Sequence, residues 1–146
     1  MVENNSFRSD HALLSIRKNI SLDQNRLHVA YHFSDQMKQL FTTEINLAMP
    51  SCDGMGGRYV YQGKIPGGFG QLLELTHLTE IILDDDTLGG SVVLKASSPV
   101  TFRAYPHYSV SQSESGFEKI MQAVTLQVEC PTTTQGLNIT LEINAR

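Results

Sequence analysis

The feature that most constrains this 146-residue chain is a hydrophobic period of two that recurs along most of its length. The alternation is clearest in residues 27–33, 41–48, 124–128 and 137–143. Every second side chain of such a run points to the same face of a strand, so the pattern is typical of strands with one buried face. Turn-forming residues separate the runs. The sequence therefore predicts an all-β fold, an antiparallel β-sandwich of roughly eight or nine strands.

Two stretches depart from this alternation. Residues 53–70 contain two glycine pairs, and the sequence predicts a long irregular loop there. Apolar residues in 117–124 recur at the spacing of a helix face, and the residues before them resemble a helix-capping box. Gly116 and the β-branched residues that follow favour a strand instead. A strand is therefore the main prediction, with a short helix as the alternative.

Composition excludes several classes of function. The chain carries 11 Lys and Arg against 15 Asp and Glu, a net charge of -4, and it has no basic cluster of the kind that nucleic acid requires. It contains no apolar run of about 18 residues, the length that spans a membrane. The polar N-terminus does not resemble a signal peptide, and the two cysteines, Cys52 and Cys130, indicate reduced thiols of a cytoplasmic protein. We expect residues 1–9 to be a flexible N-terminal segment and 10–146 to form one domain.

Three segments carry a resemblance to a known family. Residues 105–122 read YPHYSVSQSESGFEKIMQ and include a Ser-Gln-Ser-Glu-x-Gly-Phe-Glu pattern. Residues 41–49 contain Glu-x-Asn-Leu, and 81–94 read IILDDDTLGGSVVL. In this order, they resemble the C-terminal domain of family 57 glycoside hydrolases of the α-amylase and 4-α-glucanotransferase type. The match runs through most of residues 10–143.

The resemblance implies both a fold and a function. The fold is a galactose-mutarotase-like sandwich of antiparallel sheets, and this chain resembles the later part of the family's domain. The family's catalytic carboxylates lie in an N-terminal (β/α) barrel, to which nothing in this sequence corresponds. The implied function is a non-catalytic accessory domain beside that barrel, with structural and substrate-positioning roles. A stand-alone carbohydrate-binding module and a small mutarotase-like enzyme are the alternatives. An α-glucan or oligosaccharide, the barrel domain and a second copy of the chain are the expected partners.

Four candidate carbohydrate contacts lie in the segment that carries the main motif: His107, Gln112, Glu114 and Glu118. On a strand, Glu114 and Glu118 would be about 13 Å apart. Glycosidase carboxylates are about 5–9.5 Å apart. We therefore interpret these side chains mainly as hydrogen-bonding the backbone where the chain bends. Sugar contact is the alternative, catalysis is less favoured, and a pairing of Glu114 with Glu44 on another strand stays open.

The remaining candidates lie elsewhere. Glu44 and Asn46 share a polar strand face and have the groups that hydrogen-bond sugar hydroxyls, while a solvated sheet face or an interdomain contact is the main interpretation. Tyr59 and Tyr61 are interpreted mainly as packing residues of a strand, with sugar stacking as the alternative, and the absence of Trp weakens the idea of an autonomous starch-binding module. Residues 84–86 are three aspartates, which we interpret as an acidic turn rather than a calcium loop. The histidines do not have zinc-site spacing, so neither a metal nor another cofactor is predicted.

Overall fold

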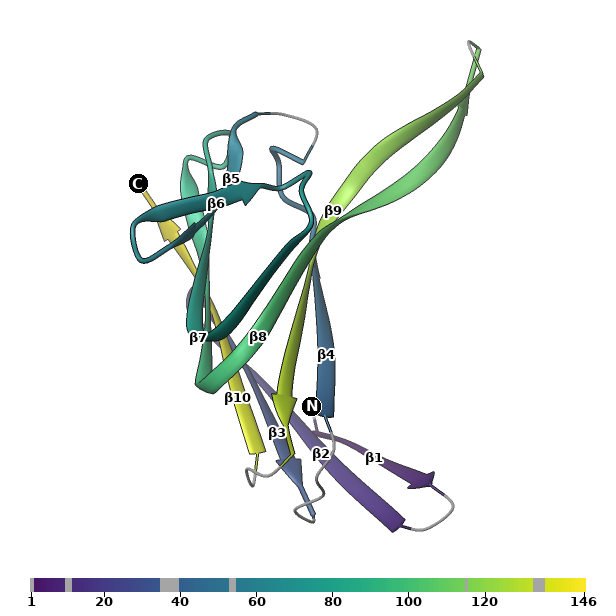
Figure 1. Ribbon diagram of the computed structural model, residues 1–146, viewed down its shortest axis with the longest axis vertical. Coiled ribbons are helices and arrows are strands. Elements are labelled where there is room, and N and C mark those ends of the chain that lie inside the picture. The colour runs from purple at the N-terminus through teal and green to yellow at the C-terminus, as the bar shows by residue number, and fades with distance from the viewer. Residues whose placement is uncertain (1, 10–11, 35–39, 53–54, 115, 133–135) are drawn as a thin grey trace.

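The computed structural model describes residues 2–9, 12–34, 40–52, 55–114, 116–132 and 136–146. Within these ranges all secondary-structure elements are β-strands, as the alternation predicts, and all strand pairs are antiparallel (Figure 1). The strands are β1 (Val2–Ser9), β2 (Ala12–Asp23), β3 (Arg26–Phe33), β4 (Leu40–Leu47), β5 (Gly57–Tyr61), β6 (Lys64–Gly68), β7 (Leu73–Asp85), β8 (Gly90–Ser113), β9 (Gly116–Pro131) and β10 (Gly136–Ala145). Helices of the length and hydropathy that could cross a membrane are absent from the described residues.

Two long strands, β7 and β8, join the two layers of the sandwich. The first part of β8 pairs with β10, which continues to β3, β2 and β1. The second part pairs with β9, which in turn pairs with β4. Between these parts the register of β7 against β8 shifts on either side of Leu78, and His77 adopts a φ of 61°. The chain therefore turns a corner there, so the same strands contribute to both layers.

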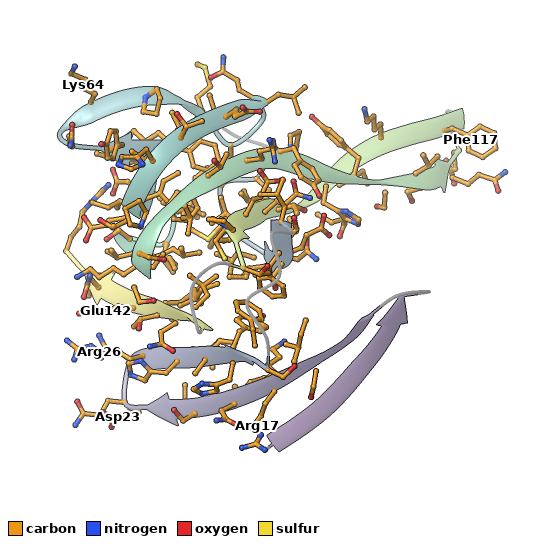
Figure 2. All side chains as sticks on the ribbon, turned by 60° about the horizontal axis from the view of Figure 1, so that its bottom comes forward. Arg17, Asp23, Arg26, Lys64, Phe117 and Glu142 are labelled. Atoms are coloured by element: carbon orange, nitrogen blue, oxygen red, sulfur yellow. The ribbon has the colours of Figure 1, made fainter. Side chains whose placement is uncertain are left out.

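The core lies between the layers and is built from the faces that the alternation identifies. Val29, Tyr31 and Phe33 of β3 are buried, and every second residue of β4 faces the same core. The ring of Phe41 lies 4.8 Å from that of Tyr31 and 5.0 Å from that of Phe33, measured between centroids. The hydroxyl groups of Tyr31 and Thr43 hydrogen-bond at 2.8 Å. These contacts hold β4 against β3, and Figure 2 shows side chains filling the space beside β3.

The glycine-rich stretch is a correction to the sequence analysis. Residues 57–68 form the hairpin β5–β6 instead of an irregular loop. Its two turn residues, Gln62 and Gly63, have φ values of 47° and 72°, the signs that a tight type I′ hairpin turn requires. Gly57 leaves room for the ring of Phe69, because a Cβ atom at this position would lie 2.1 Å from Phe69 Cδ2. Glycine here permits strand pairing and close packing, which composition alone does not reveal.

Residues 116–131 form strand β9, so the strand prediction is confirmed over the helical alternative. Ser113 pairs with Gly116 across the turn, and Gly116 has a φ of 122°, which favours glycine. Residues 108–113 and 116–121 form a two-stranded ribbon that projects from the body, and we call it the arm (Figure 1). At the other end of the fold, residues 2–9, expected to be flexible, pair with β2 as strand β1.

Candidate functional site on the outer face of the sheet

A polar surface covers the outer side of β4, β9 and β8. The strand register aligns Glu44 with Gln127 and Gln127 with Arg103. It also aligns Asn46 with Thr125 and Thr125 with Tyr105. Directly paired residues project from the same face of a sheet, so these rows lie together on one side, where Thr125 itself is buried. With their ion-pair partners they make up what we call the polar face: Glu44, Asn46, Glu74, Arg103, Tyr105, Thr125, Gln127 and Glu129.

Glu44 is the most connected acceptor of the polar face. The Tyr105 hydroxyl donates to its Oε1 atom at 2.7 Å, and Gln127 Nε2 donates to the same atom at 3.2 Å. The hydrogen bond to Glu44 raises the pKa of Tyr105, with smaller contributions from burial and from the Glu44 charge. Beside this group, Thr125 Oγ1 donates to Asn46 Oδ1 at 2.6 Å. Glu44 and Asn46 remain exposed, so both candidate residues can meet a ligand.

Arg103 fixes the other side of the polar face. Its Nε atom donates to Glu74 at 2.9 Å, and its Nη1 atom donates to Glu129 at 2.9 Å. The hydrogen bonds to Glu129 and Glu74 raise the pKa of Arg103, which stays charged. This guanidinium ties three strands together through side chains. A shallow cavity of about 280 Å³ adjoins it, lined by Leu72, Leu73, Glu74, Arg103, Ala104 and Tyr105.

The chemistry of the polar face suits binding. It presents carboxylate, amide, guanidinium and phenol groups, which together can donate to and accept from the hydroxyl groups of a sugar. Glu74 and Glu129 are ion-paired with Arg103, and Glu44 accepts from two side chains. These contacts fix the positions of the three carboxylates, and both donors to Glu44 use its Oε1 atom, so the group can still accept from a ligand. Glu44 and Asn46 are the members of this face that the sequence predicts.

Three candidates of the main motif lie away from the polar face: Gln112 and Glu118 in the arm and Glu114 in the turn at its tip. His107 lies on β8 two residues beyond Tyr105, at the border of the polar face. His107, Gln112, Glu114 and Glu118 are all exposed. Ser113 lies ten strand positions beyond Arg103, which places Glu114 about 30 Å from Glu44. A catalytic pair of these two carboxylates is therefore ruled out by distance. The prediction that this segment turns at Glu114 is confirmed by the Ser113–Gly116 pairing.

The two tyrosine candidates have different surroundings. Tyr59 is fully buried, with its ring 5.3 Å from that of Phe69, so the prediction that it stacks on a sugar is wrong. The structure places Tyr59 on the core-facing side of β5. Burial raises the pKa of the Tyr59 hydroxyl, and the neighbouring Cys52 adds to the effect. Tyr61 is half-buried and lines a cavity of about 400 Å³ together with Gln62, His77, Leu78, Thr79 and Glu80.

The three consecutive aspartates lie where β7 ends and the turn to β8 begins, so only Asp86 is in the acidic turn that the sequence predicts. Asp84 and Asp86 each form ion pairs with Arg58 and Arg146. Asp85 points inward and is fully buried. Its carboxylate accepts from the Ser51 backbone N–H at 2.9 Å and from Ser51 Oγ at 2.6 Å. These aspartates therefore hold the loop around Ser51, β5 and the C-terminus together.

Comparison with known proteins agrees with the fold and with the motifs. The family described as "Alpha-amylase/4-alpha-glucanotransferase, C-terminal" matches residues 4–143. The crystal structure of 4-alpha-glucanotransferase from Thermococcus litoralis has a similar fold, with a TM-score of 0.65 at 20% sequence identity. That match covers 99% of this chain but 20% of the glucanotransferase, so this chain spans one fifth of its length. No curated protein sequence matches. The resemblance carried by the three segments is thus confirmed, and the chain belongs to the alpha-amylase/4-alpha-glucanotransferase C-terminal family.

Proposed function

We propose that this chain is a non-catalytic accessory domain of a cytoplasmic family 57 glycoside hydrolase. In this role it packs against the catalytic barrel and helps to position an α-glucan. Its family membership supports the association with such an enzyme, and so does its length, one fifth of that of the similar glucanotransferase. Cys52 and Cys130 are not in a disulfide bond, which supports a reducing compartment.

The observation that carries the glucan contact is the exposed Glu44 carboxylate, held in place by Tyr105 and Gln127. A sugar-binding group gains affinity when its geometry is fixed before the ligand arrives, because less conformational entropy is then lost. One side of a sugar ring can lie in the adjacent cavity of about 280 Å³, next to the Tyr105 ring. The cavity next to Tyr61 is a second position for sugar contact, because an aromatic ring there is surrounded by polar side chains.

The proposal is tested by titrating the isolated chain with maltoheptaose and following backbone amide shifts by NMR. Shifts should concentrate on residues of the polar face. Glu44→Ala should lower the affinity by about tenfold or more, the cost of one hydrogen bond to a charged group. Glu114→Ala is the control, since it removes another exposed glutamate about 30 Å away. Equal affinity of the two variants would refute glucan contact at Glu44. Tyr61→Ala, measured in the same way, decides whether the second cavity contributes.

The stand-alone carbohydrate-binding module remains the second candidate function. The cavity next to Tyr61 favours it, because the chain then has a second position for sugar contact of its own. The two candidates differ in their dependence on a partner. A module binds maltoheptaose as tightly alone as beside a catalytic domain, whereas an accessory domain contributes one part of a shared site. Comparing the affinity of the chain alone with that of its complex with the catalytic domain separates them.

A further inference from the structure

One side of the arm continues the core-facing side of the sandwich. In the body, Phe102 and Ala104 of β8 face the core together with their β9 partners Val128 and Leu126. The irregularity at His107–Tyr108 takes up one extra residue of β9, so the alternation carries on into the arm. The register then puts six residues on the same side, which we call the inner face of the arm: Tyr108, Val110, Gln112, Phe117, Lys119 and Met121.

Four of the six residues of the inner face of the arm are apolar or aromatic, and exposure rises toward the tip: Met121 at the base is 5% exposed and Tyr108 is 39% exposed. Phe102 and Leu126 in the body are 1% and 0% exposed, whereas Val110 and Phe117 in the arm are 70% and 79% exposed. Figure 2 shows the Phe117 side chain at the end of the projecting ribbon, away from the body. The other side of the arm is more polar and carries Ser109, Ser111, Glu118 and Ile120. The arm is therefore an amphipathic ribbon. Its apolar side continues the core-facing side of the sandwich, but toward the tip the apolar side chains are exposed.

The strands that support β8 and β9 in the body stop short of the arm. Among the described residues, β7 pairs with β8 only as far as Ala104, and β4 pairs with β9 only as far as Val124. A ribbon of two strands is marginally stable in water unless another element packs on it. The Lys119 ammonium lies 3.9 Å from the centre of the Tyr108 ring, which holds the two strands together near the base of the arm. Phe117 and Val110, closer to the tip, still expose apolar surface that a partner would bury.

We propose that the inner face of the arm docks on the catalytic domain of the glucan-active enzyme. The inference rests on the proposed function and names the surface that makes the contact. Because this chain spans one fifth of the length of the similar glucanotransferase, most of such an enzyme lies outside it. The arm extends away from the sandwich, so it reaches a surface that the sandwich body does not cover (Figure 1). The catalytic domain supplies the second layer that β3 and β10 supply in the body.

The experiment compares amide hydrogen exchange of residues 108–121 in the isolated chain with that in its complex with the catalytic domain, or in the longer enzyme. We expect fast exchange in the isolated chain and strong protection in the complex. The double variant Val110→Ser with Phe117→Ser should bind the catalytic domain at least ~30-fold more weakly, as for loss of central apolar contacts. Leu22→Ser is the matched control, because Leu22 on β2 is 76% exposed and lies outside the arm.

The outcomes distinguish this inference from the proposed function. If the chain binds the catalytic domain while residues 108–121 stay unprotected, or if the double variant binds like the Leu22 control, docking through the arm is refuted and the accessory role stands. If the chain does not bind the catalytic domain at all, both fail. Sedimentation of the isolated chain is a third measurement. If the wild-type chain forms dimers and the double variant does not, the inner face binds a second copy of the chain and the proposal is overturned.

Discussion

Replacing Asp85 tests how the structure uses its three consecutive aspartates. This carboxylate is fully buried, and its hydrogen bonds include those from Ser51 N–H at 2.9 Å, from Ser51 Oγ at 2.6 Å and from Leu88 N–H at 2.9 Å. Asp85→Ala leaves at least these two backbone N–H donors without their acceptor, and each costs about 1–3 kcal/mol when it stays buried. We therefore expect a loss of about 4 kcal/mol in the free energy of unfolding. Asp85→Asn keeps one acceptor oxygen and should lose about 2 kcal/mol.

The assay is urea denaturation of the two variants beside Asp86→Asn, which alters an exposed member of the same three aspartates. Asp86 forms surface ion pairs with Arg58 and Arg146, so its loss should leave the midpoint near that of the wild type. For a chain of this size, about 4 kcal/mol corresponds to a fall in melting temperature of roughly 8–16 °C. If Asp85→Ala unfolds at the wild-type urea concentration, the buried acceptor role is refuted.

The same residue gives a pH dependence with a defined sign. Burial raises the pKa of Asp85, but the hydrogen bonds from the Ser51 side chain and from the backbone N–H groups of Leu88, Ser51 and Thr87 outweigh it and hold the pKa below its usual value. A lowered folded-state pKa means that the stabilisation is complete above the unfolded value of about 3.9. It is lost as the pH falls through the folded value. The difference in stability between wild type and Asp85→Asn should thus be constant from about pH 5 to 8 and shrink in acid.

Three further predictions follow from whether a side chain is buried or exposed. The Tyr59 hydroxyl is buried and has no hydrogen-bond partner among the described residues, so Tyr59→Phe should leave stability unchanged or raise it by up to about 1 kcal/mol in urea denaturation. Glu114 is exposed at the arm tip, so Glu114→Ala should change stability by less than about 0.5 kcal/mol; a larger loss would support the interpretation from the sequence that its carboxylate hydrogen-bonds the backbone. Cys130 is 1% exposed and burial raises the pKa of its thiol, so a thiol reagent should modify it only at the rate of unfolding; modification within the dead time of mixing would contradict its burial.

Strand faces could be predicted from the sequence because each alternating run needs only local information. In β4, the sequence places Phe41 and Ile45 inward and Glu44 and Asn46 outward, and the structure agrees. The partners of Glu44 could not be predicted in the same way. Tyr105 lies 61 residues away along the chain, and Gln127 lies 83 residues away. Their meeting depends on the register of three strands, which one sequence does not specify.

The errors of the sequence analysis have related physical causes. Alternation around Tyr59 was visible, but it does not say which side of an edge hairpin is buried, and the Phe69 ring decides this through contact with Gly57. Likewise, the motif at 105–122 predicted a turn at Glu114 but not that the flanking strands continue beyond their neighbours. Projection of the arm depends on where β4 and β7 end. These features are tertiary, so a pattern within one segment cannot reveal them.

The central claim is that this chain contributes binding surface to a glucan-active enzyme whose reacting carboxylates lie elsewhere. The most direct measurement is the initial rate of maltoheptaose turnover by the catalytic domain alone, by this chain alone, and by the two together. The account predicts no turnover by the chain alone above a heat-denatured control. It also predicts a lower KM when wild-type chain joins the catalytic domain, and loss of this effect with Glu44→Ala. Turnover of maltoheptaose by the chain alone, abolished by Glu44→Gln or Glu114→Gln, would contradict the claim.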